Sequence, residues 1–426
     1  MWQLKQGNCK ELIKDLEDNS IDSIVTDPPY ELGLMGKKWD NSGIAYDVEL
    51  WTECLRVLKH GGHLLAFSGS RTYHRMAVAI EDAGFEIRDQ IMWVYGSGFP
   101  KSHNIGKAID KMQGVERELY DNPKIKQQTG HKNSVAMGDK GAVKYITPYA
   151  ITDDAKQWDG WGTALKPAHE PICVARKPLI GTVAENVLNY GTGGINIDGC
   201  RVGQREKNES GWSQTDSKAS ENRAMSGANY ERAPKNEIGV GRWPANLIHD
   251  GSAEVLAGFP FSKSGAMSGE YNNTIMAQSN GNRDGKAIKL TQQASEGSAS
   301  RFFYCAKASK KDRDEGCEEI DAKLTGTYAQ DEWSKNNMGN TPDAIRMPRH
   351  NHHPTVKPTD LMRYLCRLVT PPNGLILDPF TGSGSTGKAA ILEGFRFVGF
   401  DMQSEYIDIA SARIKDAEKK INSKLF

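Results

Sequence analysis

Along positions 1–100, apolar residues recur alternately at helical spacing and in strand-like runs. The helical segments are CKELIKDLED (9–18), DVELWTECLRVLKHGG (47–62) and TYHRMAVAIEDAG (72–84). The strand-like segments are SIVTD (23–27), HLLAF (63–67) and EIRDQIMWV (86–94). Strands that alternate with helices predict a parallel sheet with helices on both faces. Gly61 and Gly62, at the end of the second helical segment, predict its glycine C-cap.

The same alternation returns after position 346. It predicts helices at 359–369, 385–395 and 404–421, and strands at 374–380 and 396–401. Each of the two regions is too small for a complete doubly wound sheet, so we expect both to form one sheet. The fold class is therefore α/β, with residues 101–345 inserted between the halves 1–100 and 346–426.

The inserted region has weaker periodicity and is rich in Gly, Ser, Asn and Lys. Residues 262–285 have the composition of a linker. Three apolar islands interrupt the region, at 163–179, 240–250 and 300–313. We expect them to be ordered strands joined by long surface loops.

Charge and targeting signals narrow the class of protein only a little. The chain has 426 residues, with 54 Lys+Arg against 54 Asp+Glu. A balanced charge does not exclude nucleic-acid binding, which needs only a local basic face. No apolar run is long enough to span a bilayer, and the N-terminus lacks the apolar core of a signal peptide. We therefore expect a cytoplasmic location and no membrane partner.

Cysteine and histidine patterns do not indicate a metal site or a disulfide framework. The seven cysteines are scattered and none are spaced as CxxC. The segment RHNHHPTVKP (349–358) holds three histidines within four residues, but no cysteine lies near them. We therefore expect no metal there.

A glycine loop follows the strand GLILDPF. Gly382, Gly384 and Gly387 fit the pattern G-x-G-x-x-G between a strand and a helix. Asp401 ends the next strand, at the distance expected of an acid that binds a ribose. This arrangement predicts a nucleotide-like cofactor.

Three cofactor classes compete for this loop. Residues 382–388 also fit the phosphate loop of an NTPase, but Ala389 stands where a Ser or Thr should hold magnesium. In a nicotinamide or flavin site, Asp378 at the loop entrance would repel the diphosphate. S-adenosylmethionine has no phosphate, and offers an α-ammonium to Asp378 and ribose hydroxyls to Asp401. The residues therefore favour S-adenosylmethionine.

The segment TDPPY ends the strand at 23–27 with an acid and two prolines. Its stiff backbone would hold the Asp27 carboxylate and the Pro28 carbonyl as two acceptors for an exocyclic amine. The Tyr30 ring would stack on the planar base that carries this amine. A base in a duplex reaches such a clamp only when it is flipped out of the helix.

Together these motifs resemble a known family. TDPPY comes first, LDPFTGSGSTG last, and HPTVKP precedes the glycine loop. This order resembles the β-type, permuted arrangement of the N-4 cytosine/N-6 adenine DNA methylases. The segments ALKPAHEPI, GRWPANLIHD and RFFYCAKASKKDR resemble phage and mobile-element members.

The resemblance implies a Rossmann-like, S-adenosylmethionine-dependent methyltransferase sheet. It assigns a catalytic half to 1–100, a target-recognition region to 101–345 and a cofactor-binding half to 346–426. The implied catalytic residues are Asp27, Pro28, Pro29 and Tyr30. The implied cofactor residues are Asn8, Cys9, His353, Thr355, Lys357, Asp378, Pro379, Phe380, Gly382, Gly384 and Asp401. Asn8 stands where the family usually has an Asp.

We therefore expect a site-specific DNA methyltransferase that acts on a flipped-out base in double-stranded DNA. The Asp at the head of TDPPY favours adenine N6. Alternatives are cytosine N4, methylation of RNA or a protein amide, and a cofactor-binding DNA module without catalysis. A homodimer and a cognate restriction nuclease are left open as partners.

Two further segments carry chemistry whose role the sequence leaves open. Trp39 and Asp40 lie on a loop that either closes over the target base or is a plain surface loop. His169 and Glu170 resemble an acid–base pair, but amine methylation needs no strong base. We expect them to be structural or pocket-edge residues.

Overall fold

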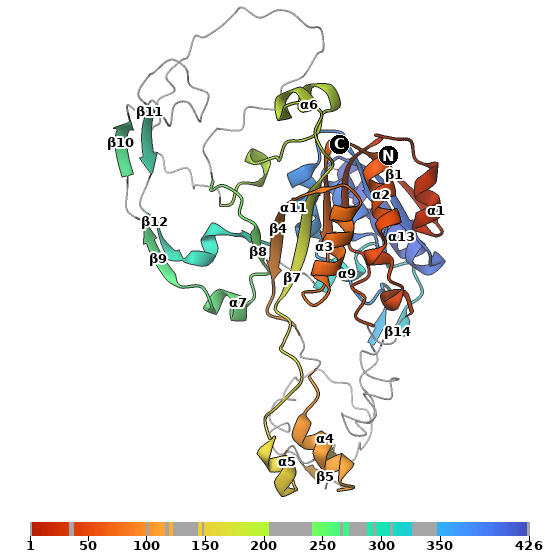
Figure 1. Ribbon diagram of the computed structural model, residues 1–426, viewed down its shortest axis with the longest axis vertical. Helices are drawn as coiled ribbons and strands as arrows, with labels where there is room; N and C mark the ends of the chain where they lie inside the picture. The colour runs from red at the N-terminus through yellow and green to blue at the C-terminus, as the bar shows by residue number, and fades with distance from the viewer. Residues whose placement is uncertain are drawn as a thin grey trace, which may run out of the picture.

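A mainly parallel sheet forms the centre of the molecule (Figure 1). The computed structural model describes residues 2–33, 38–98, 102–115, 119–121, 144–146, 149–203, 241–264, 267–271, 288–292, 295–306, 310–325 and 347–423. Nine of the strands described there form this sheet, in the order β1 (Trp2–Gln6), β17 (Arg396–Asp401), β16 (Leu375–Asp378), β2 (Ile21–Thr26), β3 (Leu58–Phe67), β7 (His169–Arg176), β4 (Glu86–Val94), β8 (Leu247–His249) and β13 (Tyr304–Cys305). All neighbours are parallel except β7, which is antiparallel to both β3 and β4. The predicted α/β class is confirmed.

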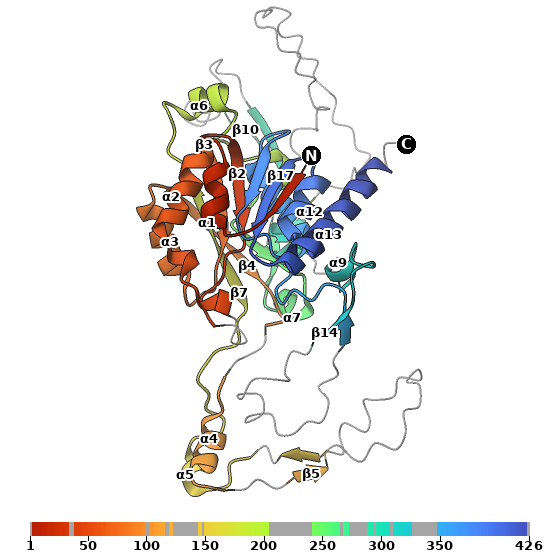
Figure 2. The ribbon, with the colours of Figure 1, turned by 90° about the vertical axis from the view of Figure 1, so that its right-hand side faces the viewer.

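Helices cover both faces of the sheet, as predicted (Figure 2). One face carries α1 (Cys9–Leu12), α2 (Val48–Val57) and α3 (Tyr73–Asp82), and the other α11 (Thr359–Val369), α12 (Ser385–Leu392) and α13 (Ser404–Asn422). Successive strand residues alternate between these two cores: Ile24 packs in the first and Val25 in the second. This alternation follows from the two-residue period of a strand. Both faces are apolar, as expected of parallel strands buried on two sides.

The predicted glycine C-cap at Gly61 and Gly62 is wrong. Helix α2 ends at Val57, and both glycines lie inside β3. The pairing of β2 with β3 jumps from Ile21–Leu58 to Ser23–His63, so the glycines occupy an irregularity in the strand. A Cβ on Gly61 would lie 2.3 Å from the amide nitrogen of Asn186. The glycines are therefore required by a bulge and by close packing, and not by a helix end.

The inserted region contributes directly to the sheet. Strands β7, β8 and β13 lie within residues 101–345 and fall in the three apolar islands. The expectation of ordered strands in those islands is confirmed. Most of the linker-like stretch 262–285 lies outside the described residues.

The remaining elements are an arm, short helices and turns, and two-stranded ribbons. Helices α4 (Ile105–Met112) and α5 (Asp153–Gln157) form an arm that projects from the body between β4 and β7 (Figure 1).

Other short helices are α6 (Val183–Tyr190), α7 (Ala253–Ala257), α9 (Lys310–Asp314) and the 3₁₀ turns Ile13–Asp15, Lys38–Asn41, Ile44–Tyr46, Asp198–Cys200 and Ala299–Phe302. Two-stranded ribbons pair β5 (Leu119–Asp121) with β6 (Lys144–Ile146), β9 (Phe261–Ser264) with β12 (Ser295–Ser298), β10 (Met267–Tyr271) with β11 (Ile288–Gln292), and β14 (Lys323–Thr325) with β15 (Met347–Arg349). Within the described ranges, no helix has the length and apolar character needed to cross a membrane.

Candidate active site

Strands β2 and β16 are neighbours although more than 300 residues separate them in sequence. Their parallel pairing places Leu377 beside Ile24, so both strands end at the same edge of the sheet. Chain connections run in opposite directions from this point, which is where open α/β sheets bind ligands. The Thr26 hydroxyl donates a hydrogen bond of 2.6 Å to Asp378 Oδ1 across the junction. The predicted catalytic loop and glycine loop therefore start side by side.

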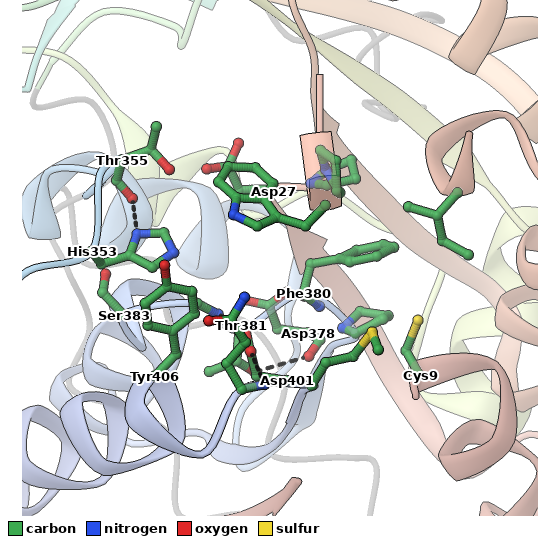
Figure 3. A pocket seen from close by; sticks show the side chains of 18 of the residues that line it. Cys9, Asp27, His353, Thr355, Asp378, Phe380, Thr381, Ser383, Asp401 and Tyr406 are labelled. Atoms are coloured by element: carbon green, nitrogen blue, oxygen red, sulfur yellow. Dashed lines mark hydrogen bonds between the residues drawn. The ribbon is translucent and has the colours of Figure 1, made fainter. Parts of the chain in front are cut away.

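A cavity of about 810 Å³ lies at this edge (Figure 3). Its volume is in the range of small-molecule sites, roughly 300–1,000 Å³. The predicted residues that line it are Asn8, Cys9, Asp27, Pro28, Pro29, Tyr30, His353, Thr355, Lys357, Asp378, Pro379, Phe380, Gly382 and Asp401. Gly384 is not among the lining residues, which are drawn from the described ranges. The structure thus brings together residues from both ends of the chain in one cavity.

Gly382 and Gly384 of the loop serve different purposes. Gly382 and Gly384 have φ values of +50° and +74°, which side chains rarely adopt. A Cβ on Gly382 would lie 2.9 Å from His353 Nε2, at the cavity wall. A Cβ on Gly384 would lie 2.7 Å from the Cα of Ala410 in α13. Gly382 therefore keeps the cavity open, while Gly384 lets the loop pack on the helix.

Two acids hold the floor of the cavity in place. Asp401 accepts hydrogen bonds from the backbone N–H groups of Gly382 (2.9 Å) and Gln403 (2.8 Å). Asp378 accepts from the Phe380 N–H at 3.1 Å, in addition to Thr26. Burial raises the pKa of Asp378 to about 6 and also raises the pKa of Asp401. Both carboxylates are therefore fixed in orientation and would gain from a cationic or hydroxyl-bearing ligand.

The loop that contains Asp27 and Tyr30 is tied to HPTVKP by a buried network. Lys357 Nζ donates to Asp27 Oδ2 at 2.7 Å and to Tyr30 Oη at 3.0 Å. Tyr30 Oη in turn donates to Glu170 Oε2 at 2.7 Å, and the same carboxylate lies 3.2 Å from Lys357 Nζ. The lysine thus joins two carboxylates and a phenol from two other regions of the chain, the loop at 27–30 and the start of β7.

Burial and neighbouring charges shift the pKa values of Asp27 and Lys357 in this network. Burial raises the pKa of Asp27, and Lys357 opposes this shift. Burial lowers the pKa of Lys357, but the carboxylates of Asp27 and Glu170 outweigh it, so its pKa is raised and it stays cationic. Asp27 Oδ1 is buried and has no hydrogen-bond partner among the described residues. The lysine therefore holds one oxygen of Asp27 and leaves the other available to a ligand.

Glu170 and the loop that contains Trp39 both lie at the site, which the sequence alone did not establish. Glu170 is the second residue of β7, and the antiparallel direction of β7 brings it to the edge where β2 ends. Trp39 and Asp40 line the cavity, and Asp40 Oδ1 accepts from the Glu31 N–H at 3.0 Å. This loop is therefore part of the cavity wall; its residues 34–37 lie outside the described ranges.

The histidines of RHNHHPTVKP each have their own protein partner. His353 Nδ1 donates to the Thr355 carbonyl at 2.7 Å, and burial lowers the pKa of His353 to about 3. His350 Nδ1 donates to the Ile320 carbonyl at 2.6 Å, and His352 Nε2 lies 3.0 Å from a Glu405 carboxylate oxygen. The buried His353 is thus a neutral part of the cavity wall.

Lys388 does not act as a phosphate-loop lysine. It is 1% exposed, and its ammonium pairs with Asp312 at 2.8 Å and Glu315 at 2.9 Å. It is not one of the residues that line the cavity. This pairing strengthens the argument against an NTPase.

Known proteins share this sequence pattern. A family model described as DNA methylase matches residues 21–412. The type II methyltransferase M.HpaI of Haemophilus parainfluenzae is 37% identical over 110 residues, which are 24% of this chain and 35% of that protein. The DNA adenine methyltransferase YhdJ of Escherichia coli K12 is 38% identical over 68 residues, which are 16% of this chain and 23% of that protein. The matched segments therefore span about a quarter to a third of the length of these relatives.

Two solved structures are similar over almost the whole chain at low identity. The M1.HpyAVI–SAM complex is 15% identical with a TM-score of 0.38, covering 97% of this chain and 99% of that chain. The cytosine-N4-specific PvuII DNA methyltransferase is 12% identical with a TM-score of 0.39, covering 99% of this chain and 92% of that chain. Because the family model spans most of the sequence, from 21 to 412, the chain belongs to the DNA methylase family.

Proposed function

We propose that this protein is a DNA methyltransferase that uses S-adenosylmethionine to methylate the exocyclic amine of a flipped-out base. One observation carries the proposal: the Asp27 loop and the glycine loop line the same cavity, and Asp27 Oδ1 has no partner in the described structure. A buried acceptor without a donor costs free energy, which a ligand amine would recover.

The cavity floor fits S-adenosylmethionine. Asp401 uses one lone pair on each oxygen for backbone N–H groups, which leaves acceptor sites for ribose hydroxyls. Asp378 is a buried acid whose raised pKa an α-ammonium would offset. Bound there, S-adenosylmethionine supplies a methyl group on a positively charged sulfur.

The catalytic loop would hold and polarise the target amine. Asp27 Oδ1 and the Pro28 carbonyl accept its two hydrogens, so its lone pair is less delocalised into the ring. Tyr30 stacks on the base, and its hydroxyl is held by Lys357 and Glu170. Because these groups are fixed before the substrate arrives, catalysis would come mainly from positioning and polar preorganisation.

Asp27 also suits the proton released after transfer. A methylated amine that still carries its extra proton is strongly acidic, so a weak base is enough. Burial raises the pKa of Asp27, which makes its Oδ1 a better acceptor for that proton than an exposed carboxylate.

Adenine N6 is the proposed target, and cytosine N4 is the alternative. The Asp at the head of TDPPY favours adenine, and a matching relative is named a DNA adenine methyltransferase. Double-stranded DNA in the cytoplasm is the proposed partner, with residues 101–345 as the target-recognition region. A homodimer and a cognate restriction nuclease, which the sequence leaves open, are not part of the proposal.

Modification-detecting sequencing of DNA from methylation-deficient cells that express the protein tests this proposal. We expect one methylated base, adenine, at a defined sequence. Asp27→Ala should abolish the modification and leave S-adenosylmethionine binding intact, whereas Asp378→Ala should weaken that binding. Cofactor binding without modification of any DNA would instead support a module without catalysis.

A further inference from the structure

The cavity presents a second buried polar group that has no hydrogen-bond partner among the described residues. Trp39 lines the cavity, and its Nε1 is buried with no hydrogen-bond partner among the described residues. Asp27 lines the same cavity, and its Oδ1 is also buried without a hydrogen-bond partner among the described residues. One group is a donor and the other an acceptor, so together they fit a ligand edge that offers an acceptor beside a donor.

Trp39 is not on a free surface loop. The loop folds back on itself, since Asp40 accepts from the N–H groups of Glu31 (3.0 Å) and Gly33 (2.9 Å). The Glu31 carboxylate closes the other side by accepting from the Gly43 N–H at 2.8 Å. Glu31 has a φ of +56°, a conformation that needs such support. The indole is therefore held at the cavity wall by an anchored loop.

We propose that Trp39 Nε1 donates a hydrogen bond to the ring nitrogen that flanks the target amine, while Asp27 Oδ1 accepts from the amine itself. This inference deepens the proposed function and rests on it. The matching edge is an amine beside an unprotonated ring nitrogen. Adenine offers N1, which shares a carbon with N6, or N7, which is one carbon further away, and cytosine offers N3, which shares a carbon with N4.

The pair of groups also explains which bases the pocket rejects. Thymine presents a carbonyl oxygen and a ring N–H on the corresponding edge. Its oxygen would face the Asp27 carboxylate, and its N–H would face the Trp39 N–H. Both groups would stay unsatisfied beside two buried protein atoms, and unpaired buried polar groups discriminate strongly between substrates.

The test removes the N–H and the ring nitrogen separately. Single-turnover transfer is measured for wild type and Trp39→Phe on a duplex with the recognised site. The same duplex is then made with 1-deazaadenine or 7-deazaadenine at the target, or 3-deazacytosine if the target is cytosine. We expect Trp39→Phe to be slower by roughly tenfold or more on the natural duplex, with S-adenosylmethionine affinity unchanged. On the analogue that lacks the contacted nitrogen, the two enzymes should differ by less than about twofold.

Controls separate the N–H from ring packing and from folding. Trp2→Phe is the matched control, because Trp2 starts β1 and donates to Glu418 on α13, away from the lining residues; it should keep full transfer. Benzothienylalanine at position 39 keeps the ring size and replaces the N–H by sulfur, and it should behave as Trp39→Phe does. Equal rates for wild type and Trp39→Phe on natural DNA would overturn the inference. So would a loss of rate in Trp39→Phe that is as large on every analogue as on natural DNA. A wild-type protein that methylates no duplex would overturn the proposed function itself.

Discussion

At the scale of single residues, Asp27 lies between opposing charges. Lys357 donates to one of its oxygens at 2.7 Å, and Glu170 contacts the same ammonium at 3.2 Å. Burial raises the pKa of Asp27; Lys357 lowers it, and the negative charge of Glu170 raises it. In the proposed mechanism Asp27 must be ionised to accept from the amine, so these two neighbours should set the low-pH limit of activity.

Matched substitutions of these neighbours should move the pH–rate profile in opposite directions. Lys357→Gln removes the charge that lowers the Asp27 pKa, so activity should be lost at a higher pH than in wild type. Glu170→Gln removes a charge that raises this pKa, so activity should persist to a lower pH. Single-turnover rates across pH measure both limits. Shifts in the same direction would show that Asp27 is not the titrating group.

The raised pKa of Asp378 predicts that cofactor binding depends on pH. Burial raises its pKa to about 6 in the free protein, and an α-ammonium binds only the ionised form well. S-adenosylmethionine affinity should therefore be constant above pH 6 and fall below it, by up to about tenfold per pH unit. Calorimetry near pH 6 should detect the proton released on binding. Asp378→Asn should bind weakly at every pH, and an unchanged pH dependence in this variant would assign the effect to another group.

The sequence predicts the site residues that lie in contiguous motifs, but not those brought in by tertiary structure. Asp378 and Asp401 each end a strand and Asp27 directly follows one, and strand ends of one parallel sheet meet at one edge. The contacts of Glu170 depend on the reversed direction of β7, which no local pattern reports. The position of Trp39 depends on hydrogen bonds within an irregular loop that has no periodicity.

At the scale of elements, the hydrophobic periodicity predicted the bounds of some helices and strands correctly. Strand β4 and helix α11 have the predicted bounds of 86–94 and 359–369. The failure at Gly61 has a physical cause: glycine serves helix ends, bulges and close contacts alike, and the partner that decides, Asn186, is distant in sequence. Local composition cannot separate these uses.

Helix α9 joins the glycine loop to the start of α11. Asp312 accepts from the Thr359 N–H at 2.7 Å at the start of α11, and from Lys388 Nζ at 2.8 Å on α12. Its backbone carbonyl accepts from Arg413, which also donates to the Ser383 carbonyl of the glycine loop at 2.7 Å. A segment of the inserted region thus stabilises the glycine loop and the two helices α11 and α12.

Asp312→Ala should destabilise the protein and weaken cofactor binding. Lys388 would keep Glu315, so we expect a loss of about 2–3 kcal/mol in the free energy of unfolding, below the roughly 3–5 kcal/mol of a fully orphaned buried charge. Denaturant unfolding and calorimetry with S-adenosylmethionine measure the two effects. Asp321→Ala, at an exposed position on the same segment, should change stability by less than about 0.5 kcal/mol. An Asp312 variant as stable as this control would exclude the bracing role.

At the scale of the whole molecule, one sheet is assembled from three parts of the chain. Helix–strand alternation predicted that 1–100 and 346–426 share a sheet, because neither region is sufficient by itself. It did not predict that β7, from 169–176, inserts between β3 and β4. Sheet order depends on long-range pairing, and the weak periodicity of 101–345 contains no information on which strand pairs with which.

The arm of α4 and α5 leaves and re-enters the body at one point. Tyr95 N–H donates to the Ala168 carbonyl at 3.0 Å, which continues the β4–β7 pairing to the base of the arm. Gly98 and Pro167 are so close that a Cβ on Gly98 would lie 1.7 Å from the Pro167 carbonyl oxygen. Within the arm, buried Asp110 accepts from the Thr152 N–H at 3.0 Å, so α4 and α5 support each other.

This geometry allows the arm to be removed without disturbing the sheet. Replacing residues 99–166 with a two-glycine turn leaves the β4–β7 pairing intact and shortens the loop that folding must close, so unfolding stability should be unchanged or higher. The cavity residues are all retained, and S-adenosylmethionine binding should be unchanged.

If the arm contacts DNA, as the proposed target-recognition region requires, removing it should lower DNA affinity by roughly tenfold or more, because each base stacked on an aromatic ring contributes about 1–3 kcal/mol. Trp158 and Trp161, which are 43% and 59% exposed, are the rings to replace by Ala in the intact protein as the milder variant. Full DNA affinity and unchanged site selectivity in the deletion would place target recognition elsewhere in the inserted region.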